Sequence, residues 1–403
     1  MSQHIGAPAV PCVEVGQRVL RGEMVGAAKG FVSVPVHAPT SGEVVAIEPR
    51  PHPMGSLLPA VVIRADGEDR WYDGLTAADP DELAPEDIVE RIRLAGVVGM
   101  GGATFPTHVK LTPPVDKPIN TLILNGVECE PYLTADHRLM LEQQGRLLQG
   151  IALIRRALGV ERAIIGIEAN KPDAIAQLTQ LGREADIEVQ SLAVKYPQGA
   201  EKQLIQVLTG RQVPSGGLPM DVGVVVQNVA TAVAVADAVT LGRPLIERVC
   251  TVTGAAVREP KNLLIRVGTT LRHIIDFCGG LAEEPGKVVL GGPMMGFAQA
   301  DLDLPALRGT SGLLLLGKSQ VNLRPEGPCI RCARCVEACP MHLLPTTISA
   351  YGRRGLLAEA EEYRVLDCIE CGCCSFACPA CIPLVQAIRQ AKAAILASKR
   401  NKV

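Results

Sequence analysis

The cysteines are the residues of this chain whose type and spacing most directly predict chemistry. Ten of the 14 cysteines lie between Cys329 and Cys381. Eight of these ten form two copies of one string, C-x2-C-x2-C-x3-C-P, which begin at Cys329 and Cys368. In such a string three thiolates can wrap one [4Fe–4S] cubane, while the fourth, at the start of the next helix, reaches the other cluster. The predicted ligand sets are Cys329, Cys332, Cys335 and Cys378 for one cluster, and Cys368, Cys371, Cys374 and Cys339 for the second.

A pair of zinc sites is the alternative for the same cysteines, because C-x2-C also binds zinc. Zinc motifs, however, use paired rather than tripled spacing, and they give no reason for the trailing Cys-Pro to recur. Iron–sulfur binding is therefore the prediction. Cys373 and Cys381 fall outside the string and are expected to be packing thiols rather than ligands.

The composition narrows the other classes of function. Apolar residues make up 47% of the 403 residues and charged residues 20%, so the chain can bury several cores. The net charge of −2 argues against a basic surface, and no nucleic-acid partner is expected. The opening MSQHIGAPAV lacks a basic-then-apolar export signal, which indicates a reducing compartment. The nearest candidate for a membrane span, 222–242, carries Gln227, Asn228 and Asp237 and is expected to be a buried strand and helix.

Strands and helices alternate in the middle of the chain. Short apolar runs predict strands at 119–126, 162–170 and 186–194, and apolar residues at helical spacing predict helices at 136–159 and 171–185. This alternation implies a right-handed parallel α/β layer. Because ligands of such sheets bind beyond the carboxyl ends of the strands, we expect a binding site at the Gly- and Asn-bearing turns there.

Segments rich in β-formers flank this layer. Val and Ile runs separated by Gly and Pro in residues 1–70 resemble the two halves of a biotinyl/lipoyl-type barrel. A carrier role would require a modified Lys29, whose surroundings do not match a carrier motif, so the barrel is expected to be structural. Residues 246–318 turn β-rich again around a short helix. From 319 onward no strand is expected, and a long helix is predicted at 384–400.

A glycine-rich segment, GVVGMGGATFPTHVKL at 96–111, is the second feature that could bind a ligand. Clustered glycines let backbone N–H groups approach a phosphate or a flavin closely, and the Lys that follows adds a point charge. The segment is neither a Walker loop nor a standard dinucleotide fingerprint. Taken alone, it is more typical of a tight turn.

Four motifs in one order carry a family resemblance. G-x-G-G-A-x-F-P-T-x-x-K resembles the flavin loop of the NADH-binding flavoprotein subunit of complex I. The segments NGVECEPYLTADHRLML (125–141), YPQGAEKQLIQVLTGRQVPSGGLP (196–219) and QNVATAVAV (227–235) are similar to the C subunits of the Rnf electron-transport complex. This resemblance covers the whole chain and implies a multidomain α/β and α+β protein. The implied domains are a biotinyl/lipoyl-like barrel sandwich at 1–70, a Rossmann-like FMN/NADH-binding domain at 71–245, a β-grasp (SLBB) module at 246–318 and a helical, ferredoxin-like two-[4Fe–4S] domain at 319–403.

The resemblance also implies which residues surround the cofactors. Around the FMN it places Gly99, Gly101, Gly102 and Lys110, with flavin hydrogen bonds from Asn125 and Glu128. Beside the nicotinamide it places Phe105 as a stacking ring, Glu130 and Glu201 as orienting carboxylates, and Tyr196 and Gly199 as part of the opposite wall. At the phosphate end it places Asn228 and Thr231. Without the resemblance, Asn125 and Glu128 would be predicted to cap the following helix, and Phe105 to lie in a core.

The implied activity is the conversion of a two-electron donor into single electrons. No catalytic acid or base is implied, because hydride transfer belongs to the bound FMN, with NAD(H) as the substrate. The implied partners are the membrane and iron–sulfur subunits of the complex, which would couple electron flow to ion translocation, and indirectly ferredoxin or flavodoxin. The implied place is peripheral, on the cytoplasmic face of the bacterial inner membrane. A cobalamin reductase of the propanediol-utilisation type and a flavin-free electron-relay subunit remain as alternatives.

Overall fold

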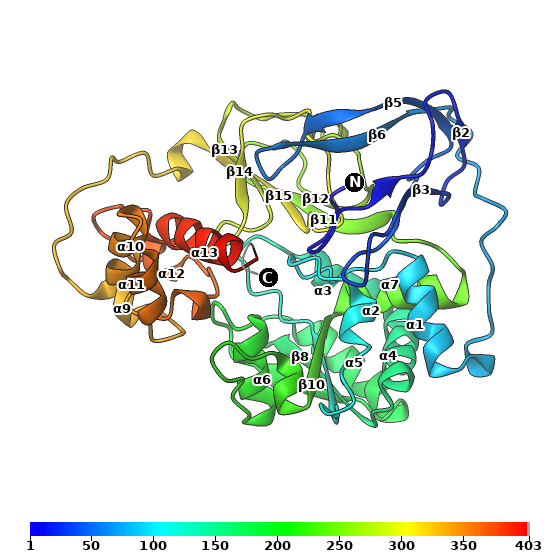
Figure 1. Ribbon diagram of the computed structural model, residues 1–403, viewed down its shortest axis with the longest axis horizontal. Coiled ribbons are helices and arrows are strands. Elements are labelled where there is room, and N and C mark those ends of the chain that lie inside the picture. Colours follow the sequence, from blue (N-terminus) through cyan, green and yellow to red (C-terminus); the bar gives the residue numbers. More distant parts are fainter. Residues whose placement is uncertain (401–403) are drawn as a thin grey trace.

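The computed structural model describes residues 1–400 of the chain. Figure 1 shows the N-terminal barrel and a second β module above a parallel α/β module, with the cysteine-bearing helices to one side. None of the helices in this part of the chain is long and apolar enough to cross a membrane. The stretch 222–242 instead forms a buried strand and a helix, as predicted.

The N-terminal module is built from two small sheets with the strand orders β1-β3-β4 and β2-β5-β6. Its strands are β1 (Val10–Pro11), β2 (Arg18–Val19), β3 (Met24–Ala27), β4 (Val36–His37), β5 (Gly42–Pro51) and β6 (Leu57–Ala65). Val19, Val25 and Val44 are at most 2% exposed and belong to one core between the sheets. Only the β5–β6 hairpin is long, and it contains Val and Ile runs of the segment 1–70 that the sequence marks as rich in β-formers.

Four parallel strands form the sheet of the α/β module in the order β10-β7-β8-β9. They are β7 (Thr121–Asn125), β8 (Arg162–Glu168), β9 (Glu188–Leu192) and β10 (Val224–Asn228). The helices are α1 (Pro85–Leu94), α2 (Thr107–Lys110), α3 (Ala135–Glu142), α4 (Gln144–Leu158), α5 (Pro172–Glu184), α6 (Glu201–Thr209) and α7 (Val229–Thr240), with short 3-10 turns at Pro80–Glu82 and Pro219–Val222. Leu122 and Leu124 join the core with α4 and α7, whereas Ile123 joins a second core with α6, so both faces of the sheet are buried.

The single helix predicted at 136–159 is wrong, because the chain breaks it into α3 and α4. Gln143 lies between the two helices with φ −127° and ψ 33°, outside the helical region. Both helices contact α7, and α3 also contacts α5 and β11. Gly150 of α4 lies so close to α7 that a Cβ there would be 1.8 Å from the Ala232 carbonyl oxygen. At the other end, the Thr134 amide before α3 donates to Thr251 of the next module.

The second β module is a mixed five-stranded sheet with the order β12-β11-β15-β13-β14. Its strands are β11 (Glu247–Thr253), β12 (Lys261–Arg266), β13 (Pro285–Leu290), β14 (Phe297–Gln299) and β15 (Gly312–Gly317), and its helix is α8 (Leu271–Phe277). The two strands β11 and β15 are parallel, and the other pairs are antiparallel. Ile274 and Ile275 of α8 are buried with Cys250 and Val252 of β11, which gives the β-grasp arrangement of one helix on a mixed sheet.

Within residues 318–400 the structure contains helices and no strand, as predicted. They are α9 (Arg334–Glu337), α10 (Pro345–Arg353), α11 (Leu357–Glu362), α12 (Cys373–Phe376) and α13 (Leu384–Arg400), with 3-10 turns at Lys318–Gln320 and Val365–Asp367. Ile348 of α10 and Ile388 of α13 are fully buried where the two helices pack together, and they lie in the core of this module. The short helices α9 and α12 lie at the same place in the two cysteine strings and contain the third cysteine of each, so the repeat in sequence is a repeat in structure.

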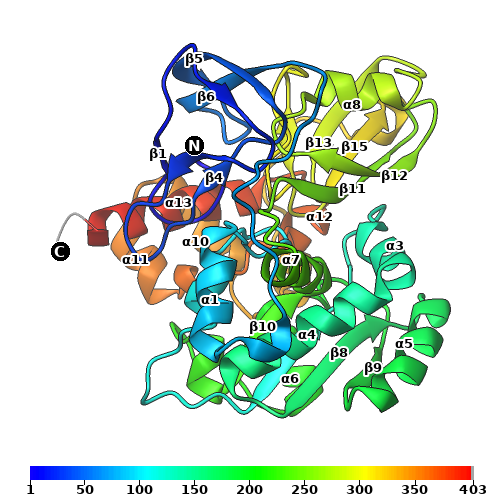
Figure 2. The same ribbon diagram turned by 90° about the vertical axis from the view of Figure 1, so that its right-hand side faces the viewer.

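Figure 2 shows the barrel beside the second β module. Charged side chains and the only tryptophan of the chain join the barrel to its neighbours. The half-buried ion network that spans this junction consists of Arg21, Asp69, Glu247 and Arg266. The Trp71 ring lies between two guanidinium groups, with the Arg21 carbon 4.1 Å and the Arg243 carbon 5.0 Å from its centroid. Cation–π contacts of this kind add to the ion pairs where the groups are partly desolvated.

Candidate functional site

The candidate flavin site lies where two neighbouring parallel strands end. Asn125 is the last residue of β7 and Asn228 the last of β10, and the two are paired in register. The Asn228 side chain caps α7, because its Oδ1 accepts from the Ala230 amide at 2.8 Å. Its Nδ2 donates to Asp136 at 2.6 Å. The structure therefore brings together Asn125 and Asn228, which are 103 positions apart in the sequence. They lie at the carboxyl edge of the sheet, which is the expected place for a ligand.

The glycine-rich loop closes over this edge as a tight turn. The Gly99 amide donates to the Phe105 carbonyl at 2.8 Å, and the Thr104 amide donates back to the Gly99 carbonyl at 3.2 Å. Gly102 has φ +109°, a conformation that side chains disfavour, and a Cβ on Gly101 would lie 3.4 Å from the Asn228 side chain. Three successive residues at the tip, 101–103, are exposed, and their amides donate to no group in residues 1–400. Adjacent free N–H groups of this kind form a concave site for an anion or another acceptor.

A second wall of the site comes from residues 196–201. The Asn125 amide group donates to the Gly199 carbonyl at 2.8 Å. Lys110, at the end of α2, donates to Glu201 at 2.7 Å and to the Val226 carbonyl at 3.1 Å. The Lys110 ammonium is thus held beside the strand ends by a half-exposed carboxylate. These contacts bring four separate segments of the chain together on one side of the site.

Two buried carboxyl groups lie behind the loop. Both oxygens of Glu128 accept backbone amides at the start of α3, from Asp136 at 2.8 Å and His137 at 3.0 Å. Burial, followed by the negative charge of Asp136, raises the pKa of Glu128 to about 8. Burial also raises the pKa of Asp136. The hydrogen bonds of Glu128 are those of a helix cap, the role that its sequence position alone predicts, and its expected bond to the flavin stays a prediction.

Glu130 and Tyr196 connect the site to the other modules. The Glu130 carboxylate accepts the Met294 amide at 3.0 Å and the Met295 amide at 2.7 Å, both after β13 of the β-grasp module. The Tyr196 hydroxyl donates to the Cys371 carbonyl at 2.8 Å, in the second cysteine string. The resemblance assigned both residues to the nicotinamide pocket, and the structure gives each a contact between modules that the sequence did not predict.

The remaining predicted residues lie around the same edge. Thr231, in the first turn of α7, is fully buried, and its hydroxyl accepts the Met100 amide of the loop at 2.9 Å. Phe105, whose carbonyl accepts the Gly99 amide, is half-buried. The Gly199 amide donates to the Cys129 sulfur at 3.3 Å. With its free amides, a lysine and polar strand ends, this edge fits a flavin carrying acceptor atoms and a phosphate.

Four of the predicted cluster cysteines lie around one cavity, and the division of all eight into two ligand sets stays a prediction. All four thiols of the second set line one apolar cavity, together with side chains such as Met341, Leu343 and Ile388. Of the first set, Cys335 and Cys378 lie in one small core. Burial raises the pKa of Cys335, and the nearby Cys378 and Cys329 raise it further. No three Cys, His, Asp or Glu side chains of residues 1–400 converge on a point where one metal ion would bind. Thiols that surround a cavity rather than a point fit a cubane better than zinc.

Cys373 is not one of the four cysteines of the second string, but it lies next to them. Its pKa rises to about 12 because of burial and the neighbouring thiols of Cys371, Cys374 and Cys339. Cys381 accepts a hydrogen bond from the Asn322 side chain at 3.3 Å. Neither residue replaces a member of the two sets, so their expected role as packing thiols stays a prediction.

Comparison with protein families matches four successive segments of the chain. Residues 1–68 match the RnfC barrel sandwich hybrid domain, 92–237 the Nuo51 FMN-binding domain, 249–298 the SLBB domain and 322–379 the 4Fe-4S dicluster domain. The multidomain fold class is thereby confirmed, and the matched domains imply one FMN site and two [4Fe–4S] clusters.

Two curated proteins are similar along nearly the whole chain. The C subunit of the proton-translocating ferredoxin:NAD(+) oxidoreductase complex of Clostridium ljungdahlii is 53% identical over 367 residues, which cover 91% of this chain and 80% of that protein. The C subunit of the Na(+)-translocating ferredoxin:NAD(+) oxidoreductase complex of Acetobacterium woodii is 49% identical over 403 residues, 100% of this chain and 91% of that protein. Among solved structures, a NAD+-reducing [NiFe]-hydrogenase in its H2-reduced state shares the fold, with a TM-score of 0.55, 20% identity and coverage of 78% of this chain and 62% of that chain. The chain belongs to the RnfC family, the C subunits of ion-translocating ferredoxin:NAD+ oxidoreductase complexes.

Proposed function

We propose that this protein exchanges electrons with NAD(H) at the edge formed by β7 and β10 and with a one-electron carrier at its cysteine module. Bound FMN would supply the conversion between a hydride pair and single electrons, which neither a nicotinamide nor a [4Fe–4S] cluster can perform alone. The observation that carries the proposal is the Tyr196–Cys371 hydrogen bond, because it fixes the second cysteine set against the wall of the flavin site.

The chain's own residues bind and orient in this proposal. The free amides of 101–103 and the Asn228 end of α7 would bind acceptor groups of the flavin, with Lys110 adding positive charge. Phe105, Glu130, Tyr196 and Glu201 are the proposed nicotinamide neighbours. Asn125 donates to the Gly199 backbone, and Glu128 accepts a backbone amide at the start of α3. The binding site would therefore be largely formed before a ligand enters.

The two cysteine sets differ in exposure, which suggests their order. The second set faces the flavin module, whereas Cys329 and Cys332 of the first set are exposed. Two apolar side chains beside the first set are also exposed, Ile330 by 66% and Phe376 by 82%. We infer that the first set is where electrons pass to or from the partner, an iron–sulfur subunit of the complex, and indirectly ferredoxin or flavodoxin. The proposed domain limits remain 1–70, 71–245, 246–318 and 319–403, and the proposed place is the cytoplasmic face of the inner membrane.

The test uses the full chain, purified without oxygen and loaded with FMN and iron–sulfur clusters. Addition of NADH should bleach the flavin absorption and then produce the EPR signals of reduced clusters. A wild-type chain that binds no FMN would support the flavin-free relay instead. Rapid reduction of a cobalamin, without reduction of a ferredoxin, would favour the cobalamin reductase alternative.

The position of the protein in the complex is tested separately in cells. The chain should sediment with membranes that contain the whole complex, and it should be released from membranes that lack the other subunits. Firm binding of the purified chain to bare liposomes would contradict attachment through partners.

A further inference from the structure

Two arginines of the β-grasp module are buried behind the glycine-rich loop. Arg248 on β11 is 3% exposed, and Arg308, in the segment before β15, is 1% exposed. Neither forms an ion pair with a carboxylate in residues 1–400. Both lie far from the loop in sequence, and no motif marks either of them.

Arg308 donates a hydrogen bond to the beginning of the loop. Its Nη1 donates to the Gly96 carbonyl at 2.9 Å, and its Nη2 donates to the Pro35 carbonyl of the barrel at 2.9 Å. Gly96 has φ +67°, and a Cβ there would lie 2.5 Å from the Pro35 oxygen and 3.0 Å from the guanidinium. The neighbouring Gly309 lies against the other end of the loop, where a Cβ would be 2.7 Å from the Thr104 methyl group.

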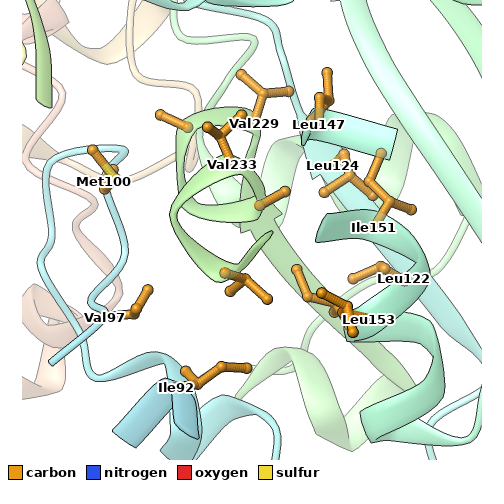
Figure 3. Packing of buried hydrophobic residues seen from close by; sticks show 14 of the residues in the cluster. Ile92, Val97, Met100, Leu122, Leu124, Leu147, Ile151, Leu153, Val229 and Val233 are labelled. Atoms are coloured by element: carbon orange, nitrogen blue, oxygen red, sulfur yellow. The ribbon is translucent and has the colours of Figure 1, made fainter. Parts of the chain in front are cut away.

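Arg248 holds the middle of the loop. Its Nη2 donates to the Met100 carbonyl at 3.4 Å, and its Nη1 donates to the Arg308 carbonyl at 2.6 Å, so the two arginines are linked. The Met100 amide is fixed from the opposite side by Thr231. Figure 3 shows Met100 and Val97 on the loop beside Val229 and Val233 of α7.

The direction of these bonds matters for the loop tip. In a trans peptide the carbonyl of one residue and the N–H of the next point in opposite directions. Because the Met100 carbonyl points at Arg248, the Gly101 N–H points away from the Arg248 guanidinium. The arginine therefore orients the first of the three free amides.

Energetics make a purely structural role a poor explanation. A buried guanidinium without a carboxylate at ion-pair distance is costly, and apolar residues of similar size often give equal or greater stability. Burial lowers the pKa of Arg248, although the charges of Cys250, Asp136 and Glu128 oppose this. Burial lowers the pKa of Arg308 to about 10. The Arg308 Nε also has no hydrogen-bond partner in residues 1–400. We therefore expect the compensating benefit to come from the loop backbone that the arginines hydrogen-bond.

We propose that Arg248 and Arg308 are positioning residues of the flavin site, through which the β-grasp module sets the backbone of Gly96–Pro106 so that its free amides face the flavin. This inference rests on the proposed flavin site. It assigns the β-grasp module a role as the rigid back of the flavin loop.

The test compares Arg248→Met and Arg308→Met in the full chain with Arg272→Met, a matched change of an exposed arginine on α8 of the same module. The two buried changes should raise the FMN dissociation constant by roughly tenfold, equivalent to about 1.4 kcal/mol. They should also shift the midpoint potential of the bound flavin, because that potential depends on the hydrogen bonds made to it. Arg272→Met should change neither quantity.

Hydrogen exchange separates positioning from loss of folding. In the absence of FMN, the hydrogen-bonded amides of Gly99, Met100 and Thr104 should exchange faster in both variants, while the cluster EPR signals and the melting temperature are retained. Wild-type affinity, potential and loop exchange in both variants would overturn the inference. A wild-type chain that binds no FMN would instead overturn the proposed function, so the two failures can be told apart.

Discussion

At the scale of single residues, Glu128 shows how the fold changes the chemistry of a side chain. Its carboxyl group is buried beside Asp136, and its oxygens accept the first amides of α3. Burial is the largest cause that raises its pKa to about 8, and the bonds from the two amides and the charge of Lys171 only partly oppose it. The folded chain therefore binds this proton more tightly than the unfolded chain does.

The sign of this difference gives a pH prediction. Because the folded pKa is raised, the contribution of Glu128 to the free energy of unfolding is greatest below about pH 4.5 and falls as the pH rises toward about 8. Glu128→Gln should remove this slope, even if it lowers the melting temperature at every pH. Calorimetric melting of the full chain between pH 5.5 and 8.5 measures the slope, with the exposed Glu142→Gln as the control. Equal slopes in Glu128→Gln and wild type would contradict the shifted pKa.

At the scale of elements, each cysteine string contains one short helix, α9 or α12, and the last cysteine of the string comes just after that helix. Cys339 follows α9 and lines the cavity of the second set, and Cys378 follows α12 and lies near Cys335 of the first. The predicted ligand sets would therefore interlock the two strings, because neither set could be completed by one string alone.

This exchange predicts how cysteine variants should pair. Cys329→Ser and Cys378→Ser should each remove the same cluster EPR signal, and Cys368→Ser and Cys339→Ser should each remove the other. Cys373→Ser is the control and should retain both signals and the full iron content. If Cys378→Ser removed the signal that Cys368→Ser removes, the assignment of ligand sets would be wrong.

The elements also show why sequence reasoning succeeded in some places only. The strands of the α/β sheet and the long C-terminal helix were predicted because their apolar runs have a clear period and end at Gly or Pro. The break at Gln143 was missed because α3 and α4 share one continuous apolar pattern. What divides them is tertiary: α4 packs against α7, while the start of α3 bonds to Thr251.

At the scale of the whole molecule, contacts between modules place the cysteine sets relative to the flavin site. The Tyr196 hydroxyl reaches the Cys371 carbonyl, and the Gln203 side chain donates to the Pro340 carbonyl at 3.1 Å. A Cβ on Gly372 would lie 2.6 Å from the Met294 carbonyl oxygen, so the cysteine module also packs tightly on the β-grasp module. Both cysteine strings therefore meet the other modules through their backbones.

Tyr196→Phe tests this docking. Loss of the hydroxyl should remove about 1 kcal/mol of docking free energy and slow the passage of electrons from flavin to clusters, with FMN content unchanged. Stopped-flow mixing with NADH would follow flavin and cluster absorption separately, with the exposed Tyr72→Phe as the control. Cluster reduction at the wild-type rate in Tyr196→Phe would show that the hydrogen bond does not set the distance.

These contacts between modules could not be predicted from the sequence, and the reason is physical. Tyr196 and Cys371 are 175 residues apart, and the acceptor is a backbone carbonyl, which every residue possesses. Arg248 and Arg308 likewise bind carbonyl groups, so their partners leave no pattern of residue types. The cysteine ligands were predictable because thiols are rare and their spacing is fixed by the cubane.

The tryptophan at the junction of the modules has a practical consequence. Trp71 is the only one in the chain, and it lies between a guanidinium of the barrel and one of the α/β module, next to the ion network that reaches the β-grasp strands. Indole emission responds to the charge and solvent around the ring. The intrinsic fluorescence of this protein is therefore a built-in optical probe of whether three of its four modules remain assembled, and it can be read without any label.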